Sequence, residues 1–202
     1  KFLASAAYDN GQNGDVTAND GYVGKIPVQM PLPKNGGSYV IYNASGKLVI
    51  GKMNTDDGVR SMSGVAATVA GEGTAATADV NNGGLIFNVT TQTSADGKTI
   101  YYTFENNGKY LASDVTEQLF VQDTQSDNTQ WTLENISGGW LIKNKAAAWV
   151  SSSGSKYPVY IEYFSGAFAG YSFKANSSDI FTFNFYGAED TYGTGYVVNP
   201  KV

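Results

Sequence analysis

The sequence predicts an all-β domain with a β-trefoil-like architecture of three pseudo-repeats. Three observations support this fold class. The 202 residues include 24 glycines, 14 tyrosines and 10 phenylalanines, a bias that suits pleated strands joined by tight turns. Most apolar runs have strand length, about four to eight residues, and no useful helical stripe occurs. One sequence segment is also repeated along the chain.

The repeated segment defines the units. Residues 39–51 (YVIYNASGKLVIG) and 101–113 (YYTFENNGKYLAS) align without a gap, with an aromatic first and a Gly-Lys pair at the eighth and ninth places. Residues 140–152 (WLIKNKAAAWVSS) form a third copy in which Ala147 and Ala148 replace that pair. Units that cannot bury their own apolar face must close on one another. We therefore expect three units around a pseudo-threefold axis.

The units are expected at 38–99, 100–138 and 139–187. Each opens with a hairpin and closes on a strand that carries a large buried aromatic, which the spacing identifies as Phe87, Trp131 and Phe181. Gly46 and Gly108 are expected to supply the positive φ that the hairpin turns need. A two-sheet β-sandwich is the alternative fold, because alternating β-sequences also show accidental self-similarity.

Segments on either side of the 38–187 domain differ in composition. Residues 1–37 are polar and rich in turn residues, and three of the five prolines lie within 25–37. Proline fixes φ and removes a hydrogen-bond donor, so we expect an extended linker whose alternating apolar residues dock as an edge segment. Residues 188–202 are expected to form a C-terminal linker. The chain is therefore interpreted as a module cut from a larger protein.

Composition excludes several classes of function. The formal net charge of −5, with a single arginine, argues against a nucleic-acid partner. The chain has no cysteine and no histidine, which removes disulfides, thiolate nucleophiles, Cys/His zinc sites and an imidazole base. No apolar run approaches the roughly 18–20 residues that span a bilayer. We find no catalytic constellation and expect no enzyme activity, no metal and no cofactor.

Aromatic residues gather between positions 149 and 173 around one acid. Strand alternation places Tyr157 and Tyr163 on one face and Tyr160 and Glu162 on the other. Sugars bind by stacking on aromatic rings while carboxylates and amides take their hydroxyl groups. The candidate ligand-binding residues are Trp149, Tyr157, Tyr160, Glu162 and Tyr163. Alternatively, these rings pack a trefoil cap or an interface with a neighbouring domain.

The pattern "YVIYNASGKLVIG … NNGKYLAS … QWTLEN … GWLIKN … YIEYF" extends over about residues 38–187. It resembles the ricin-like trefoil modules at the C-terminal side of large secreted nucleotidases, endonucleases and glycan-processing proteins of gut Firmicutes and related bacteria. The resemblance implies a non-catalytic accessory module of a secreted or cell-surface multidomain protein. Such a module binds a glycan or polysaccharide, or it is a structural spacer without a ligand that packs on neighbouring domains.

The sequence departs from ricin-type lectins at their Gln-x-Trp hallmark. The order here is Thr129-Gln130-Trp131, with no residue between the glutamine and the tryptophan. This difference weakens any transfer of the lectin sugar pockets to this chain. Trefoil lectins often place an acidic residue after the hairpin of a unit, and the resemblance therefore makes Asp114 a further candidate for ligand binding.

Overall fold

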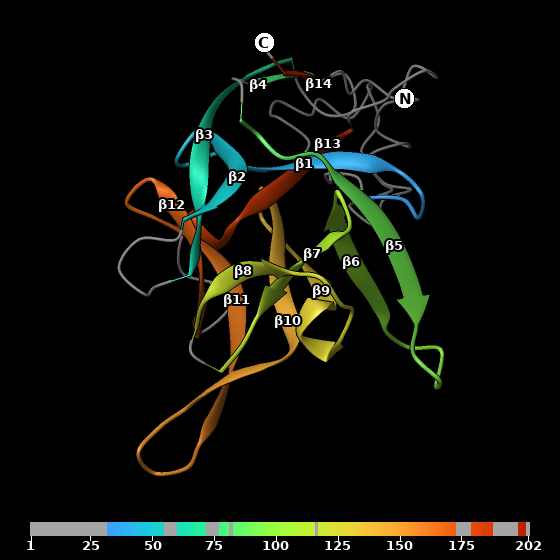
Figure 1. The fold of residues 1–202 in the computed structure, drawn as a ribbon, viewed down its shortest axis with the longest axis vertical. Coiled ribbons are helices and arrows are strands. Elements are labelled where there is room, and N and C mark those ends of the chain that lie inside the picture. The colour runs from blue at the N-terminus through green and yellow to red at the C-terminus, as the bar shows by residue number, and fades with distance from the viewer. Residues whose placement is uncertain are drawn as a thin grey trace, which may run out of the picture.

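The described part of the chain is built from β-strands and two short 3-10 turns. The structure is a computed structural model. It describes residues 32–54, 60–71, 77–80, 83–115, 117–172, 179–187 and 198–200. The all-β prediction is confirmed, and Figure 1 shows the strands in chain order. No helix within these ranges is long and apolar enough to cross a membrane.

The strands fall into the three expected groups. The first contains β1 (Ser38–Asn43), β2 (Leu48–Asn54), β3 (Ser61–Ala70), β4 (Thr77–Val80) and β5 (Phe87–Thr93). The second contains β6 (Ile100–Asn106), β7 (Lys109–Ser113), β8 (Leu119–Gln122), the turn η3 (Asp127–Thr129) and β9 (Trp131–Ile136). The third contains β10 (Gly139–Val150), β11 (Lys156–Phe164), β12 (Ala167–Ser172), η4 (Asp179–Phe181) and β13 (Phe183–Gly187). A short strand, β14 (Val198–Pro200), follows them.

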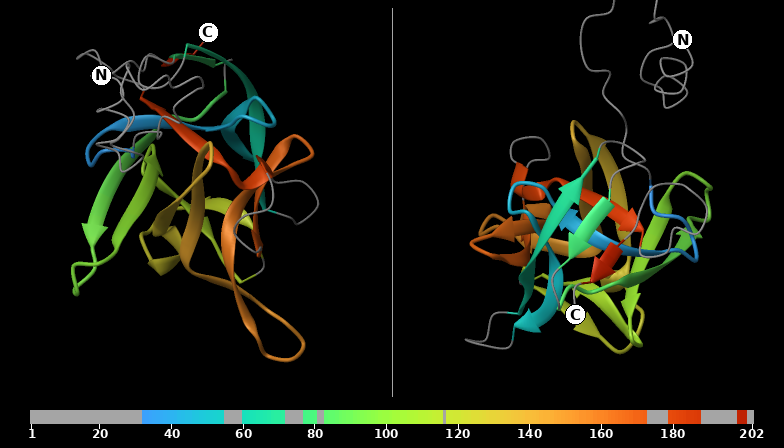
Figure 2. Two further views of the ribbon diagram at one scale, coloured as in Figure 1. Left: turned by 180° about the vertical axis from the view of Figure 1, so that it is seen from behind. Right: turned by 90° about the horizontal axis from the view of Figure 1, so that it is seen from above.

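Six strands pair in a closed ring. Going round it, β1 pairs with β5, β5 with β6, β6 with β9, β9 with β10, β10 with β13, and β13 with β1 again, always antiparallel. Each unit thus gives its first and last strand to the ring, while β2–β3, β7–β8 and β11–β12 form hairpins outside it. This arrangement fits a β-trefoil. It does not fit the alternative sandwich, whose two sheets do not close into a ring. Figure 2 shows the molecule from behind and from above.

The ring encloses one apolar core that draws on all three units. Phe87, Trp131 and Phe183 begin the last ring strand of their units and are fully buried. The core also takes two buried residues from each outer hairpin, namely Ile50 and Met62, Leu111 and Leu119, and Ile161 and Phe168. The indole N–H of Trp131 donates to the carbonyl of Leu111 at 3.0 Å, so this buried donor is satisfied.

The closing aromatic of the third unit differs from the expectation. The sequence spacing pointed to Phe181, but that residue ends η4 and packs in a separate cluster with Leu141 and Tyr160. Phe183, two residues later, occupies the position that Trp131 has in the second unit, because each follows a 3-10 turn by the same offset. Both phenylalanines are buried, so hydrophobicity alone could not separate them.

All three copies of the repeated segment share one turn interaction. The side-chain oxygen of the fifth residue accepts the backbone N–H of the eighth: Asn43 from Gly46, Glu105 from Gly108, and Asn144 from Ala147. The first and third of these hydrogen bonds measure 2.8 Å. This shared turn explains why the copies remain related although the Gly-Lys pair is missing from the third.

The two turn glycines serve different purposes. Gly108 has φ +79, as expected. In the first copy the residue with positive φ is Lys47 (φ 53), so the expectation for Gly46 is wrong. A Cβ on Gly46 would lie 2.8 Å from the ring of Tyr163. Glycine is therefore required there because the Tyr163 ring packs directly against its Cα.

Parts of both expected linkers contact the body. The backbone N–H of Gly36 donates to Val89 at 2.7 Å, and the N–H of Val89 donates to Gly37 at 2.8 Å, so the end of segment 1–37 docks beside β5. The alternating apolar residues before Leu32 lie outside the described residues. Within 188–202, β14 pairs in parallel with β4, so this range is not wholly a linker.

Candidate functional site

Two of the candidate aromatics form an exposed pair. Trp149 on β10 and Tyr157 on β11 are directly opposite each other in the antiparallel register. Their ring centroids are 5.5 Å apart and the rings are tilted by 39°. They remain 40% and 46% exposed, respectively. The hairpin of β10 and β11 projects away from the barrel, which carries this pair outward (Figure 1).

The hairpin ends in a serine-rich loop. The backbone N–H of Ser151 donates to the carbonyl of Ser155 at 2.9 Å, and Gly154, with φ +82, allows the tight return. The hydroxyls of Ser151 and Ser153 are 2.8 Å apart, and those of Ser153 and Ser155 are 3.3 Å apart. A row of serine hydroxyls therefore lies in the loop that joins the strands of Trp149 and Tyr157.

Tyr160 is a core residue and not an exposed platform. It is only 4% exposed and packs with Leu141 and Phe181. Burial, followed by the charge of the nearby Glu134 carboxylate and a hydrogen bond to it, raises the pKa of its phenol to about 12. The ring cannot stack on a ligand without opening this cluster.

Glu162 is also buried, with 9% of its surface exposed. Burial, followed by the charge of the neighbouring Glu117 carboxylate, raises the pKa of its carboxyl to about 7. Glu117 is held in place because it accepts the backbone N–H of Ser172 at 2.8 Å. The Glu162 carboxyl therefore keeps its proton to a higher pH than an exposed glutamate does.

Tyr163 and Asp114 are committed to contacts within the protein. The Tyr163 ring is partly buried, with its centroid 5.9 Å from that of Phe168. Asp114 forms a salt bridge with Arg60. The Arg60 guanidinium also lies 3.7 Å from the ring centroid of Phe120, so it links the first unit to the second.

The predicted site residues therefore do not form one patch. Trp149 and Tyr157 are exposed together, whereas the candidates Tyr160 and Glu162 are buried. The physical reason is that both faces of β11 are covered over 159–162, one by the barrel core and the other by the cluster around Phe181. The exposed part of the β10–β11 hairpin, which carries Trp149 and Tyr157, lies outside residues 159–162.

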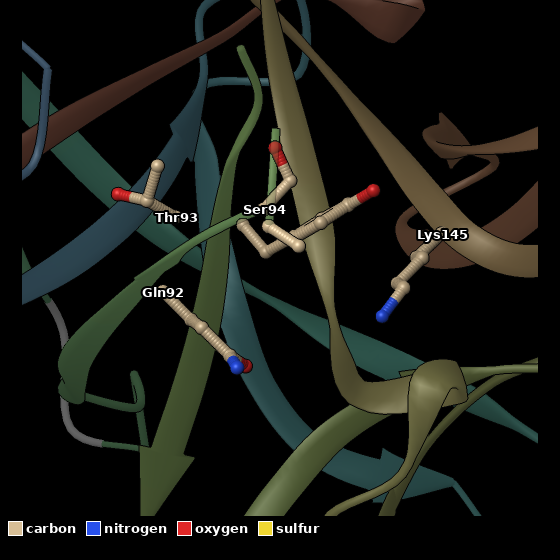
Figure 3. Close-up of a pocket in the computed structure, with 6 residues that line it drawn as sticks. Gln92, Thr93, Ser94 and Lys145 are labelled. Carbon is tan, nitrogen blue, oxygen red and sulfur yellow. The ribbon is translucent and has the colours of Figure 1, made fainter. Parts of the chain in front are cut away.

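A small pocket lies elsewhere on the barrel and was not predicted. It has a volume of about 280 Å³ and is lined by Gln92, Thr93, Ser94, Ala95, Tyr101 and Lys145. In Figure 3, Gln92 and Lys145 approach it from opposite sides. The residues come from the end of β5, the start of β6 and the turn region of β10.

A chain of hydrogen bonds fixes the pocket side chains. The Lys145 ammonium donates to Asp127 at 2.8 Å and to Gln130 at 2.6 Å, and it lies 4.5 Å from the ring centroid of Tyr101. The Gln130 amide donates in turn to Gln92 at 3.2 Å. A flexible lysine is thereby held in one place at the pocket wall.

Sequence reasoning had no local signal for this pocket. Gln92 and Tyr101 are opposite each other across the hairpin that joins the first two units, and Lys145 belongs to the third. Only the closure of the ring brings them together. The one usable hint was that Tyr101 and Lys145 both fall within copies of the repeated segment.

The described residues contain no group of three or more His, Cys, Asp or Glu side chains placed to hold a metal ion. The carboxylates discussed above are each near a cation, a backbone donor or a single second carboxylate. The hairpin and the pocket present stacking and hydrogen-bonding groups, among them the Ser94 hydroxyl, which donates to the Asp96 carboxylate at 2.5 Å.

Comparisons with known proteins give structural similarities only. No family model matches the sequence, and no curated protein matches it. The solved structure "SeviL bound to asialo-GM1 saccharide" has a TM-score of 0.45 at 16% identity, covering 76% of this chain and 98% of that one. The structure "BEL beta-trefoil apo crystal form 3" has a TM-score of 0.49 at 13% identity, covering 78% and 97%. The fold assignment rests on the closed ring of strands and not on these two structures.

Proposed function

We propose that this domain is a non-catalytic carbohydrate-binding module. The observation that carries the proposal is the exposed cross-strand pair of Trp149 and Tyr157, with rings 5.5 Å apart on a projecting hairpin. Exposed aromatic rings of this kind offer apolar faces on which a pyranose can stack. The neighbouring hydroxyls of Ser151 and Ser153 offer partners for sugar hydroxyl groups.

We propose further that the module serves a secreted or cell-surface bacterial protein and keeps a neighbouring domain near its substrate. This part rests on the resemblance of the repeated segment to accessory trefoil modules. A structural spacer without a ligand is the second candidate, favoured by the burial of Tyr160 and Glu162 within the covered part of β11, residues 159–162.

A glycan array separates the two candidates. The intact chain should bind one or a few related glycans, and the double variant Trp149→Ala/Tyr157→Ala should lose that binding while remaining folded. Phe164→Ala is the matched control, because Phe164 is an exposed aromatic (68%) at the other end of β11 and is expected to change nothing. A blank array from folded wild-type protein would favour the spacer.

A further inference from the structure

The pocket beside Lys145 has the size of a site for one small molecule. Its volume of about 280 Å³ lies just below the range of roughly 300–1,000 Å³ that is usual for drug-sized ligands. The lining combines an aromatic ring, an amide, a hydroxyl and an ammonium group, from Tyr101, Gln92, Ser94 and Lys145. Such a wall suits a compact ligand that both donates and accepts hydrogen bonds.

The charges around the pocket do not favour a strongly charged ligand. Lys145 is paired with Asp127, so its positive charge is already compensated. A second carboxylate, Asp96, accepts a hydrogen bond from the Ser94 hydroxyl at 2.5 Å. That hydrogen bond, together with one from the Lys98 backbone, lowers the pKa of Asp96 and keeps it ionised. Lys145 is the one charged residue in the lining, and because Asp127 already pairs with it, the pocket offers no uncompensated charge to either an anion or a cation.

The side chains that line the pocket retain hydrogen-bonding capacity for a ligand. An ammonium group has three donors, and Lys145 uses two of them on Asp127 and Gln130. The Gln92 side-chain carbonyl oxygen accepts a hydrogen bond from Gln130. The amide N–H groups of Gln92 have no partner among the described residues, so they can donate to a ligand. The Gln92 amide and the Lys145 ammonium therefore present two preorganised hydrogen-bond donors to the same pocket.

We propose that this pocket is a second carbohydrate site that holds a single neutral pyranose residue, with Gln92 and Lys145 donating to its hydroxyl groups. The inference rests on the proposed function for its ligand class but uses different residues from the hairpin. Lys145 and Trp149 are four residues apart on β10, at most about 13 Å along a strand. One oligosaccharide of a few residues can therefore reach from the pocket towards the aromatic pair.

Nuclear magnetic resonance on the intact chain tests the two sites in one spectrum. The ¹⁵N-labelled protein is titrated with the methyl glycosides of glucose, galactose and N-acetylglucosamine, and separately with glucuronate, up to about 100 mM, which is ~100 times a Kd of 1 mM. The Gln92 side-chain amide and the Lys145 backbone amide report on the pocket. The Trp149 indole N–H reports on the hairpin.

We expect saturable shifts at Gln92 and Lys145 with at least one neutral glycoside and weaker shifts with glucuronate. Gln92→Ala should abolish the Lys145 response and leave the Trp149 response, while Trp149→Ala should do the reverse. Shifts at Trp149 without shifts at Gln92 and Lys145 would overturn this inference and leave the proposed function standing. Tighter binding of glucuronate would overturn the neutral ligand class. Silence of all three reporters in folded protein would count against both.

Discussion

Glu162 shows how one residue makes the stability of the domain depend on pH. Its carboxyl is buried on β11, and burial, followed by the charge of Glu117, raises its pKa from 4.5 to about 7. A carboxyl with a raised pKa in the folded state favours folding when it is protonated. Its contribution is fully present below pH 4.5 and is lost as the pH rises towards 7.

Replacing Glu162 with glutamine should therefore stabilise the domain only at higher pH. A shift of this size corresponds to at most about 3.5 kcal/mol, since each pKa unit is worth about 1.4 kcal/mol, and solvent screening lowers this limit. We expect Glu162→Gln to raise the free energy of unfolding at pH 8 by up to that amount and to leave it nearly unchanged at pH 4. Urea unfolding at both pH values measures the difference.

Asp123→Asn is the control for that experiment, because the Asp123 side chain is 80% exposed and pairs only with a surface lysine. It should change stability little at either pH. An equal effect of Glu162→Gln at pH 4 and pH 8 would mean that the carboxyl does not titrate in this range.

Gly46 and Gly108 provide a second prediction about single residues. Gly46→Ala should destabilise the domain by about 1–3 kcal/mol, because its Cβ meets the Tyr163 ring. Adding Tyr163→Leu should recover part of that loss. Gly108→Ala should cost about 1–2 kcal/mol through its positive φ, and Tyr163→Leu should not alter this cost, since no atom lies within 4 Å. Thermal unfolding of the single and double variants gives the coupling energy, which should be near zero for Gly108.

The shared hairpin turn allows the three units to be compared. Asn43 is fully buried and also donates to the carbonyl of Thr182 at 3.0 Å, whereas Glu105 is only partly buried. Asn43→Ala leaves buried groups without partners and should cost about 2–3 kcal/mol. Glu105→Ala should cost less than about 1 kcal/mol. Chemical unfolding of both variants checks this order. Equal losses of unfolding free energy would show that burial does not determine how much the turn residue contributes to stability.

The hairpin of β10 and β11 illustrates why the site was only partly predictable. Alternation along β11 correctly separated its two faces, but it could not show that both faces are covered over 159–162. The covering residues, Leu141 and Phe181, are distant in sequence from Tyr160. Trp149 and Tyr157 escape burial only because the two strands, of 12 and 9 residues, extend past the body.

For the whole molecule, the repeat in the sequence was enough to predict three units but not how they meet. The aromatic residues that begin the three copies, Tyr39, Tyr101 and Trp140, each lie in the first strand of a unit. Some contacts between units, such as the salt bridge of Arg60 with Asp114, come from residues outside the repeat pattern. The pocket near Lys145 depends on the same long-range closure, and no motif in the sequence encodes it.

The closed ring predicts that the three units unfold together. Because β13 pairs with both β1 and β10, the third unit cannot unfold without breaking its strand pairs with the first. Native-state hydrogen exchange should give one common free energy of opening for the buried amides of the six ring strands, with fast exchange in the loop 151–155. Separate opening of one unit, with the other two still protected, would show that the ring does not act as one cooperative body.

The proposal of carbohydrate binding is tested most directly by calorimetric titration of the best glycan from the array. The wild type is compared with Trp149→Ala, Tyr157→Ala and the control Phe164→Ala. We predict at least a tenfold rise in Kd for each of the first two, about 1.4 kcal/mol of binding free energy, and a change within about twofold for Phe164→Ala. If Trp149→Ala and Tyr157→Ala bind the glycan as tightly as the wild type, the hairpin pair is not the binding platform.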